Sequence, residues 1–398
     1  MGESTRRSEL DAEHLTGVLR EQGVGQLAGS EELTLVLDGM ELRREGAVAQ
    51  EHLMQVRDLD GGLVNGYRSF NVLGIGSEGK RGLLYHRLFS SQEPGFVSEN
   101  TEIEQALAAT EASLAGLDVP KTWVWDRGFD NDALWWWVWE HSSSHLVWRV
   151  KQLGRIVLWR TEDGVWEERY LDATLSAAQP LATLETELEI CLQGQKRTKR
   201  QPVTVDLLAV PLRVYAPAAK ARRSKKAGDN ASGAALPDPQ RPTKDVWLVK
   251  VAVRQAVTEP WLLLTDWPVT DADSALRIFR FYRLRWAVED TFKFVKNAFG
   301  IEDVQMLKLK AVRTLVALAW VAAGFLFQLG LTLDQPEIRL LARLGGWDER
   351  PNRPPGKLVL SRGLSRILDM LATEALLADH IAQHGDLPPF IKQLLARR

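Results

Sequence analysis

The spacing of hydrophobic and polar residues changes along the chain, and it predicts which segments are strands and which are helices. Apolar runs bounded by turn residues predict strands, and apolar residues at every third or fourth position predict helices. Up to about residue 151 the order is a helix (8–21), three extended segments (32–42, 51–76, 82–90), a helix (99–117), a strand (122–126), a Trp-rich helix (131–142) and a strand (145–152). Three extended segments before the first helix–strand alternation predict a meander that joins a mixed sheet.

The pattern changes near residue 152, where short strand-like runs begin to recur. They predict a β-rich insertion, within which an Ala-, Pro-, Gly- and Lys-rich stretch has the composition of a disordered loop. Core-like strand and helix patterns then resume. The predicted organisation is a short N-terminal helical segment (1–30), the first part of an α/β core (31–151), the insertion (152–257) with its loop (216–245), the second part of the core (258–333) and a helical C-terminal region (334–398).

Composition narrows the class of protein only a little. Hydrophobic residues make up 45% and charged residues 26% of the 398, which is ordinary for a soluble globular protein. A formal net charge of −2 neither supports nor excludes a nucleic-acid partner, because binding needs a local basic surface. The single cysteine, Cys191, excludes an internal disulfide and a multi-cysteine zinc site, and it favours a reducing compartment, the cytoplasm.

Two segments imitate well-known motifs. Residues 314–333 are apolar enough for a membrane span, but Gln328 interrupts them and amphipathic segments surround them, so we expect a buried core helix and no membrane. The stretch "GIGSEGKR" (74–81) matches a phosphate-binding loop until Arg81 takes the Ser/Thr position. A strand pattern follows it, which predicts a hairpin turn.

The segment "FYRLRWAVEDTFKFVK" (281–296) has polar residues in an ordered file. Tyr282, Arg285, Glu289 and Lys296 lie at offsets 0, 3, 7 and 14, which on one helix fall within roughly 60° of arc. A simpler explanation is helix stabilisation, since i, i+4 pairs such as Arg285–Glu289 need no function.

Two aspartates end strand-like runs: Asp38 closes "LTLVLD" and Asp126 closes "TWVWD". A carboxylate beside a buried strand is costly unless it is paired or bound to a cation. Each could be a helix cap or a turn former. Together with Glu289, they could instead hold two divalent cations for phosphodiester chemistry.

The four residues of the file fill the pattern Y-x-x-R-x-x-x-E-x-x-x-x-x-x-K, and here the sequence resembles DDE transposases of the IS-four insertion-sequence family. "LVLDGMEL" and "VWDRGFDN" are similar to the segments that carry the family's two aspartates, and "WLLLTDWPV" and "LARLGG" also resemble it. The resemblance covers about residues 30 to 365.

The resemblance implies a ribonuclease-H-like mixed sheet in which a β-rich insertion separates Asp126 from Glu289. It implies that Asp38, Asp126 and Glu289 bind two Mg²⁺ or Mn²⁺ ions and catalyse strand cleavage and strand transfer in cut-and-paste transposition. It also implies double-stranded DNA as partner, at the terminal inverted repeats and the target, and a homodimer at the nucleoid of a bacterium. Candidate DNA contacts are Tyr282, Arg285, Lys293, Lys296, Trp261, Arg149 and Lys151.

Some assignments keep an alternative. Trp261 either receives a flipped base or packs in the core, while the cluster Trp135–Trp139 is expected to be core. The basic runs 195–200 and 220–226 either contact DNA or are solvated loops. The segment before Asp38 is short compared with family members, so a shortened form that inhibits the full-length enzyme without cutting is the second hypothesis.

Overall fold

The structure, a computed structural model, describes residues 11–161, 163–195, 198–218, 241–254, 256, 258–348 and 355–395. Within these residues twelve strands form one mixed sheet, with the order β2-β3-β1-β5-β6-β12-β11-β10-β7-β8, while β4 pairs with β3 and β9 with β10. The strands are β1 (Leu33–Arg43), β2 (Met54–Arg57), β3 (Leu63–Ile75), β4 (Arg81–Phe89), β5 (Lys121–Trp125), β6 (His145–Arg149), β7 (Ile156–Arg160), β8 (Trp166–Tyr170), β9 (Ala182–Ile190), β10 (Lys199–Tyr215), β11 (Thr243–Val253) and β12 (Trp261–Thr265).

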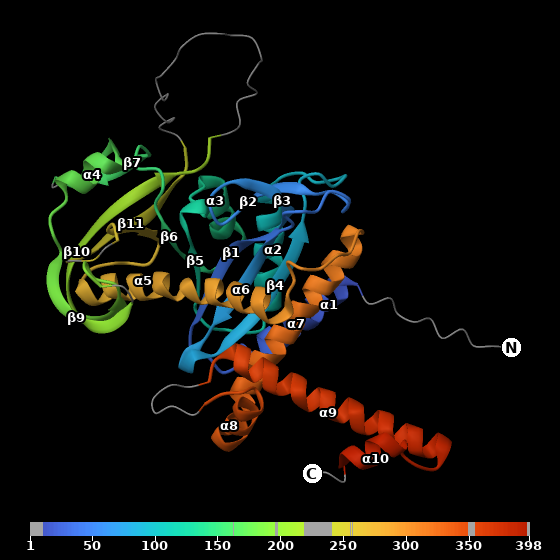
Figure 1. The fold of residues 1–398 in the computed structure, drawn as a ribbon. Helices are drawn as coiled ribbons and strands as arrows, with labels where there is room; N and C mark the ends of the chain where they lie inside the picture. The colour runs from blue at the N-terminus through green and yellow to red at the C-terminus, as the bar shows by residue number, and fades with distance from the viewer. Residues whose placement is uncertain are drawn as a thin grey trace.

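Helices cover both faces of the central strands of this sheet (Figure 1). α5, α6 and α7 pack on one face, where they share a hydrophobic cluster with β1, β3 and β4. α2 and α3 lie over a second cluster on the other face. The helices are α1 (Ala12–Leu27), α2 (Glu99–Ser113), α3 (Asp132–His141), α4 (Leu171–Ala177), α5 (Ala272–Leu284), α6 (Trp286–Phe299), α7 (Leu309–Thr332), α8 (Gln335–Leu344), α9 (Lys357–His384) and α10 (Pro389–Leu395), with short 3₁₀ turns η1 (Ser77–Gly79) and η2 (Arg127–Phe129).

The centre of the sheet consists of three parallel strands, β1, β5 and β6. The first five residues of β1, "LTLVL", are all buried, because both faces of the strand are covered by helices. Residues pointing to alternate faces therefore feed the two different clusters: Val36 belongs to one and Leu35 to the other. The predicted mixed sheet and α/β fold are confirmed.

The predicted meander is present, with one more strand than expected. The segment 51–76 divides into β2 and β3, because Asp58 and Gly62 form a turn in which Asp58 Oδ1 accepts hydrogen bonds from Asp60 N and Gly62 N at 3.0 and 2.6 Å. The hairpin predicted at "GIGSEGKR" is confirmed: η1 joins the antiparallel strands β3 and β4.

The strands predicted as an insertion extend the same sheet. β11 pairs with β12, β10 pairs with β11 along eleven register positions, and β7 and β8 follow. We call β7–β11 with α4 the wing. The short helix α4 was not predicted, and the predicted disordered loop (216–245) is too long at its end, because β11 begins at Thr243. Residues 219–240 of that loop lie outside the described residues, as does the basic run 220–226.

The segment 281–296 was predicted as one helix, and this is wrong in one detail. α5 ends at Leu284 and α6 begins at Trp286. At the junction the backbone tightens, since Arg285 N donates to Tyr282 O and Val288 N donates to Arg285 O, both three residues back. Arg285 itself keeps helical backbone angles, so α5 and α6 run on as nearly one rod (Figure 1).

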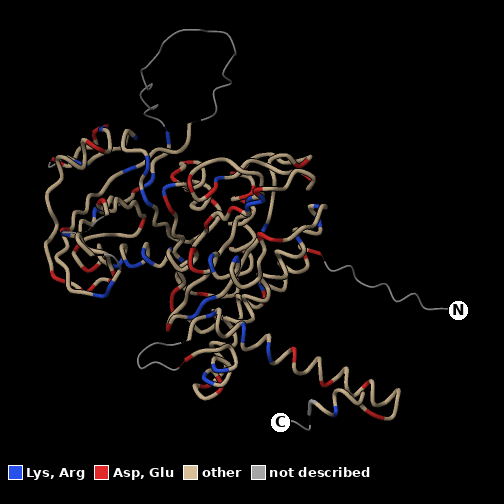
Figure 2. Tube along the Cα trace, viewed as in Figure 1, with Lys and Arg blue, Asp and Glu red and all other residues tan. Residues whose placement is uncertain are grey.

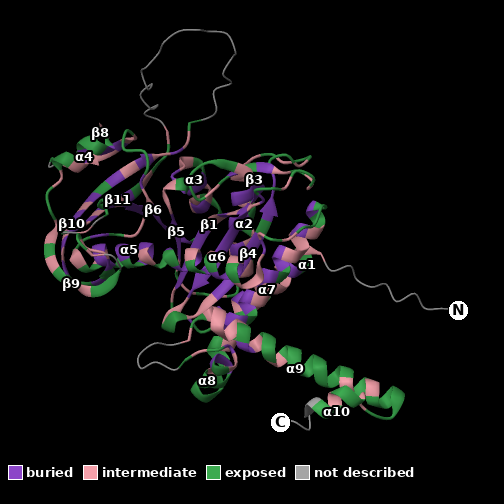
Figure 3. Ribbon diagram, viewed as in Figure 1, coloured by how far each residue is buried: buried purple, intermediate pink, exposed green. Residues whose placement is uncertain are grey.

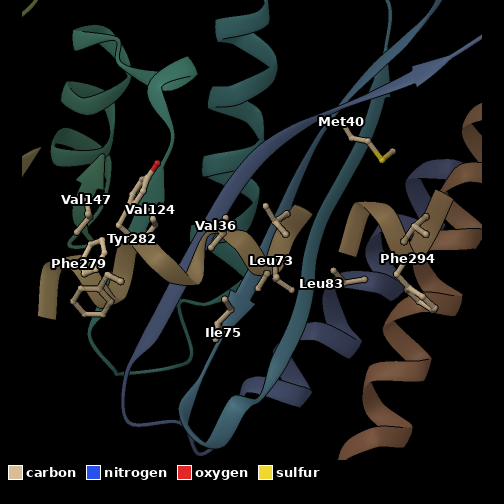
Figure 4. Packing of buried hydrophobic residues seen from close by; sticks show 14 of the residues in the cluster. Val36, Met40, Leu73, Ile75, Leu83, Val124, Val147, Phe279, Tyr282 and Phe294 are labelled. Carbon is tan, nitrogen blue, oxygen red and sulfur yellow. The ribbon is translucent and has the colours of Figure 1, made fainter. Parts of the chain in front are cut away.

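In the described part of the chain, α7 is the helix that is long and apolar enough to cross a membrane. Of its most apolar 18-residue stretch, 44% is buried inside the fold. It packs along α1 and β4 and contributes Val316, Trp320 and Ala323 to the core. Figure 4 shows part of this core, with Leu73, Ile75 and Leu83 of the meander between α6 and the strands.

The predicted helical C-terminal region is confirmed, and most of it projects from the body. In α9, 28 residues long, Gly363 is the buried residue, and Figure 3 shows the rest of the helix exposed or half-buried. α8 and α9 touch backbone to backbone: a Cβ on Gly363 would lie 1.9 Å from Leu341 O, and one on Gly345 would lie 2.0 Å from Val359 O. Glycine is required at both positions, and we call this contact the glycine notch.

Candidate active site

Asp38 and Asp126 lie side by side because their strands are parallel neighbours. The pairing of β1 with β5 ends at Val36 and Val124, and each aspartate follows two residues later. Asp126 directly follows β5, as predicted. Asp38 was predicted to end its strand, and this is wrong: β1 continues to Arg43, because on its other side it remains paired with β3, with Asp38 opposite Asn71.

The helical segment α5–α6 brings two of the four file residues, Tyr282 and Arg285, onto these aspartates, and Arg285 links a third, Glu289, to them. Tyr282 Oη donates a hydrogen bond to Asp126 Oδ1 at 3.0 Å. Arg285 Nη1 contacts Asp38 Oδ2 at 3.0 Å, and Arg285 Nη2 contacts Glu289 Oε1 at 2.6 Å. Figure 4 shows Tyr282 among the core residues near Val124, with its hydroxyl at the edge of the cluster. The i, i+4 pair is therefore real, and it is part of a larger group.

Burial dominates the electrostatics of this group. It raises the pKa of Asp38 to about 6, with Arg285 acting in the opposite direction and Asp126 and Glu289 adding to the rise. Burial likewise raises the pKa of Tyr282 to about 12, and the charge of Asp126 adds to it, so the hydroxyl keeps its proton at neutral pH. For Arg285 burial alone would lower the pKa, but Asp126 and Asp38 outweigh it and hold the pKa above its ordinary value.

A comparison with protein families identifies the domain that contains this site. A model of the family described as transposase DDE domain matches residues 92–323, more than half of the chain. The chain belongs to the transposase DDE domain family. No curated protein matches the sequence. The matched segment contains Asp126, Tyr282, Arg285 and Glu289, while Asp38 precedes it.

Membership of this family makes the chain a nuclease- or transposase-type enzyme that acts on DNA, and its relatives generally use divalent metal ions. The donor set around Arg285 suits such ions, because Asp38, Asp126 and Glu289 offer only carboxylate oxygens, the ligands that Mg²⁺ and Mn²⁺ prefer. No group of three His, Cys, Asp or Glu among the described residues is arranged as a ready metal centre. The Arg285 guanidinium lies between Asp38 and Glu289 instead.

The remaining predicted residues of the transposase lie at different distances from this group. Lys296 contacts Glu302 Oε1 at 2.8 Å and donates to the carbonyl of Glu41, so it lies farther along β1. Arg149, at the end of β6, is half-buried and close enough to Tyr282 to lower the pKa of its hydroxyl.

Three predicted DNA contacts lie outside the group. Lys293 is exposed on α6, and Lys151 is exposed beyond β6. Trp261 is 9% exposed and packs on Phe279 with ring centroids 5.0 Å apart, so the structure places it in the core. The Trp-rich helix packs on the second core cluster, as expected: Trp135 is buried there, with its ring centroid 4.4 Å from that of Trp148 on β6. The run 195–200 is described except for residues 196 and 197, and its last two residues begin β10.

The sequence reasoning missed Asp130, which organises the loop beside the site. Its buried carboxylate accepts hydrogen bonds from Lys151 N at 2.6 Å and Gln152 N at 2.9 Å, and pairs with Arg155 at 2.9 Å. The guanidinium of Arg155 lies 4.1 Å from the ring of Trp135. A second acid four residues after Asp126, in "DRGFD", was the available signal.

A second omission is a buried polar row beside Asp38. Asn71, opposite Asp38 on β3, donates to Ser69 Oγ at 3.1 Å and contacts His86 Nδ1 through its amide oxygen at 2.7 Å. Burial lowers the pKa of His86 to about 3, so its ring is neutral. Polar residues at alternate positions of the otherwise apolar "SFNVLGI" could have revealed this row.

Proposed function

We propose that this chain is a cut-and-paste DNA transposase of the IS-four insertion-sequence family. The observation that carries the proposal is the convergence of Tyr282, Arg285 and Glu289, all from one helical segment, on Asp38 and Asp126 from two adjacent parallel strands. Three of the four residues with a fixed spacing in the sequence thus acquire a spatial reason for that spacing. A helix that carried only stabilising ion pairs would have no need to reach both aspartates.

We further propose that β1 and β3–β6 form a ribonuclease-H-like core. The support is their arrangement: β1, β3 and β4 form an antiparallel meander, and β5 and β6 lie on the other side of β1, parallel to it. The helices that connect β4 to β5 and β5 to β6 share one face. In the sequence the wing lies between β6 and β12, but in the sheet these two strands are neighbours and the wing extends beyond β12. The glutamate-bearing helix therefore comes late in the sequence and still packs beside β1.

Asp38, Asp126 and Glu289 would hold two Mg²⁺ or Mn²⁺ ions in this proposal. When bound, such ions activate the attacking water or 3′ hydroxyl and stabilise the leaving oxygen of the phosphodiester. The protein keeps Asp38 half-buried and fixed by the hydrogen bond that Gly39 N donates to Oδ1 at 2.8 Å, so this ligand is oriented before any ion arrives.

The polar residues around the acids would position the DNA backbone. Arg285 and Lys296 carry positive charge, and the Tyr282 hydroxyl keeps its proton and can donate a hydrogen bond. Arg149 extends this set from β6. Trp261 is buried, so receiving a flipped base would require it to leave the ring of Phe279.

The proposed partners are the element's terminal inverted repeats, target DNA and a second copy of the chain, in the bacterial cytoplasm. A homodimer is supported by α9, whose exposed residues include the large apolar side chains Leu368, Met370, Leu371, Leu376 and Ile381. The dimer would bring two transposon ends together.

The test is cleavage of a DNA fragment that carries the element's own flanking end, with and without Mg²⁺ or Mn²⁺, read on a denaturing gel. The expected result is metal-dependent nicking at the end, lost by more than about 1,000-fold in Glu289→Gln, since a metal centre supplies several kcal/mol of transition-state stabilisation. Asp290→Asn, which neutralises the exposed neighbouring acid, is the matched control and should cut normally.

Other results would redirect the assignment. Normal cleavage by Glu289→Gln would remove this residue from the active site. End binding without cleavage by the folded wild-type chain would favour the second hypothesis, a non-cutting form that inhibits the full-length enzyme.

A further inference from the structure

We propose that Arg285 is an internal stand-in for the divalent ions: its guanidinium bridges the carboxylates in the metal-free protein and must leave them when the ions bind. This inference rests on the proposed function and adds a role for Arg285 beyond contact with DNA. It makes the metal-free site a closed ion-pair group, and it makes Arg285 a direct competitor of the metal.

The way in which Arg285 is held supports this role. Its two terminal nitrogens go to two different acids, Asp38 at 3.0 Å and Glu289 at 2.6 Å, instead of gripping one carboxylate with both. Arginine at a surface usually prefers the two-pronged grip on a single carboxylate. Asp38 and Glu289 would hold an ion through their carboxylate oxygens, and the guanidinium already occupies one oxygen of each.

The carboxylate of Asp38 leaves little room for the Arg285 guanidinium and a metal ion at the same time. Its Oδ1 accepts from Gly39 N at 2.8 Å, and its Oδ2 is taken by Arg285. Asp126 Oδ1 likewise accepts from Tyr282. Each carboxylate of the group therefore already has a partner from α5–α6. An ion that entered would have to displace at least the Arg285 contact to reach Oδ2 of Asp38.

The charges of the group give the exchange a driving force. Three ionised carboxylates around one guanidinium leave a net charge of −2, and without the guanidinium the charge is −3, which attracts a divalent cation more strongly. The effect is largest in a buried site, where solvent screens little, and Arg285 is only 5% exposed.

The surroundings of Arg285 favour its release from the carboxylates, and one side of the bridge is open to solvent. Its Nε is buried without a hydrogen-bond partner among the described residues, so the bridge does not satisfy the whole guanidinium. The Glu289 side chain is 43% exposed, which opens one end of the bridge to solvent. The neighbouring Trp286 ring, 53% exposed, lies 5.0 Å from the guanidinium. A DNA phosphate arriving there offers a two-pronged acceptor in exchange.

Metal and phosphate binding would therefore be coupled through one side chain. A phosphate that draws Arg285 away frees carboxylate oxygens, and an ion that displaces Arg285 frees a guanidinium for phosphate. Such coupling is reciprocal by thermodynamic necessity. It would keep ions weakly bound until DNA is present.

The test measures Mn²⁺ binding to the full-length chain by titration calorimetry, without DNA and without any cleavage assay. Arg285→Gln should bind Mn²⁺ about 5- to 100-fold more tightly than wild type, the usual range of a coupling between two ligands at linked sites. Arg285→Lys, whose ammonium cannot bridge two acids in the same way, should fall between them. Of the three substitutions within the group, Tyr282→Phe should have the smallest effect, because the hydroxyl it removes is neutral.

Lys293→Gln is the matched control. It removes the same charge from an exposed position one turn beyond Glu289, and its Mn²⁺ affinity should equal that of wild type. Mn²⁺ should also raise the melting temperature of Arg285→Gln more than that of wild type, which checks binding to the folded protein.

Each alternative outcome has a distinct meaning. Equal or weaker Mn²⁺ binding by Arg285→Gln and Arg285→Lys would overturn the stand-in role while leaving the metal centre in place. An equal gain in Lys293→Gln would overturn it as well, because overall charge would then suffice. Absence of Mn²⁺ binding from wild type and every variant would overturn the proposed metal centre itself, and this inference with it.

Discussion

Two arginine–carboxylate groups, one in the core and one on the wing, have similar chemistry and opposite surroundings. At the end of β11, Arg254 grips Asp206 with two contacts of 2.9 and 3.0 Å, and the two side chains are 58% and 39% exposed. Arg285 reaches two acids with single contacts and is nearly buried. The Arg254–Asp206 pair on the wing therefore has the better hydrogen-bond geometry, but solvent screens its charges.

Location, more than hydrogen-bond geometry, determines how much each of these ion pairs contributes to stability. Figure 2 shows acidic and basic positions interspersed over the wing, where Arg200–Glu187 and Arg213–Asp245 also pair across neighbouring strands. Exposed pairs of this kind contribute little to stability. In the core, the same contacts hold unlike charges in a low dielectric, so removal of one member leaves the others uncompensated.

The largest expected effect comes from breaking the core group. Arg285→Ala should lower the free energy of unfolding by about 3–5 kcal/mol in metal-free buffer, because Asp38 and Glu289 would remain near each other without their shared partner. Urea unfolding followed by circular dichroism measures the change. A loss below about 1 kcal/mol would mean that the core group is as weak as a surface pair.

An intermediate effect concerns pH. The folded pKa of Asp38 is about 6 and its ordinary value is 3.8, so between these values the folded protein holds a proton that the unfolded chain has released. The contribution of this group to stability is therefore present at low pH and is lost as pH rises from about 4 to about 6.

Asp38→Asn cannot titrate and should lack this part of the pH dependence. The stability difference between Asp38→Asn and wild type should thus shift in favour of the variant as pH rises through that window. Urea midpoints in metal-free buffer at several pH values measure the shift. Parallel pH profiles for the two proteins would show that Asp38 titrates at its ordinary value.

The smallest effect should come from the wing. Arg254→Ala removes both contacts to Asp206, but solvent replaces them, so the urea midpoint should stay within the error of measurement. The same substitution should leave Mn²⁺ binding unchanged. A destabilisation comparable to that of Arg285→Ala would contradict the conclusion that the exposed pair contributes less to stability than the core group.

The sequence predicted the strands and the polar file well, for a physical reason. β1 and β5 are short apolar runs ended or interrupted by an acid, and such runs have few alternatives to a buried strand. The offsets of Tyr282, Arg285, Glu289 and Lys296 depend only on helix geometry, so a local rule was enough to place them on one side.

The errors arose where a long-range contact overrides the local pattern. Asp38 lies in the middle of its strand because β3 keeps pairing with β1 after β5 has stopped, and pairing partners are not visible in a local window. The role of Asp130 likewise depends on partners more than twenty residues away, at Lys151, Gln152 and Arg155. Trp261 could be placed in the core only once Phe279 was known to face it.

The glycine notch at the root of α9 has a mechanical consequence. About 32 Å of α9 lies beyond Gly363, so a change of roughly 10° in its crossing angle with α8 would move its far end by about 5 to 6 Å. Backbone contact at Gly345 and Gly363 leaves no side chain to compress or slide, which makes α9 a stiff lever. The direction of α9 is therefore set by two positions that lack a Cβ, Gly345 and Gly363. A molecule that binds the far end of α9 would do so at an angle that this contact defines.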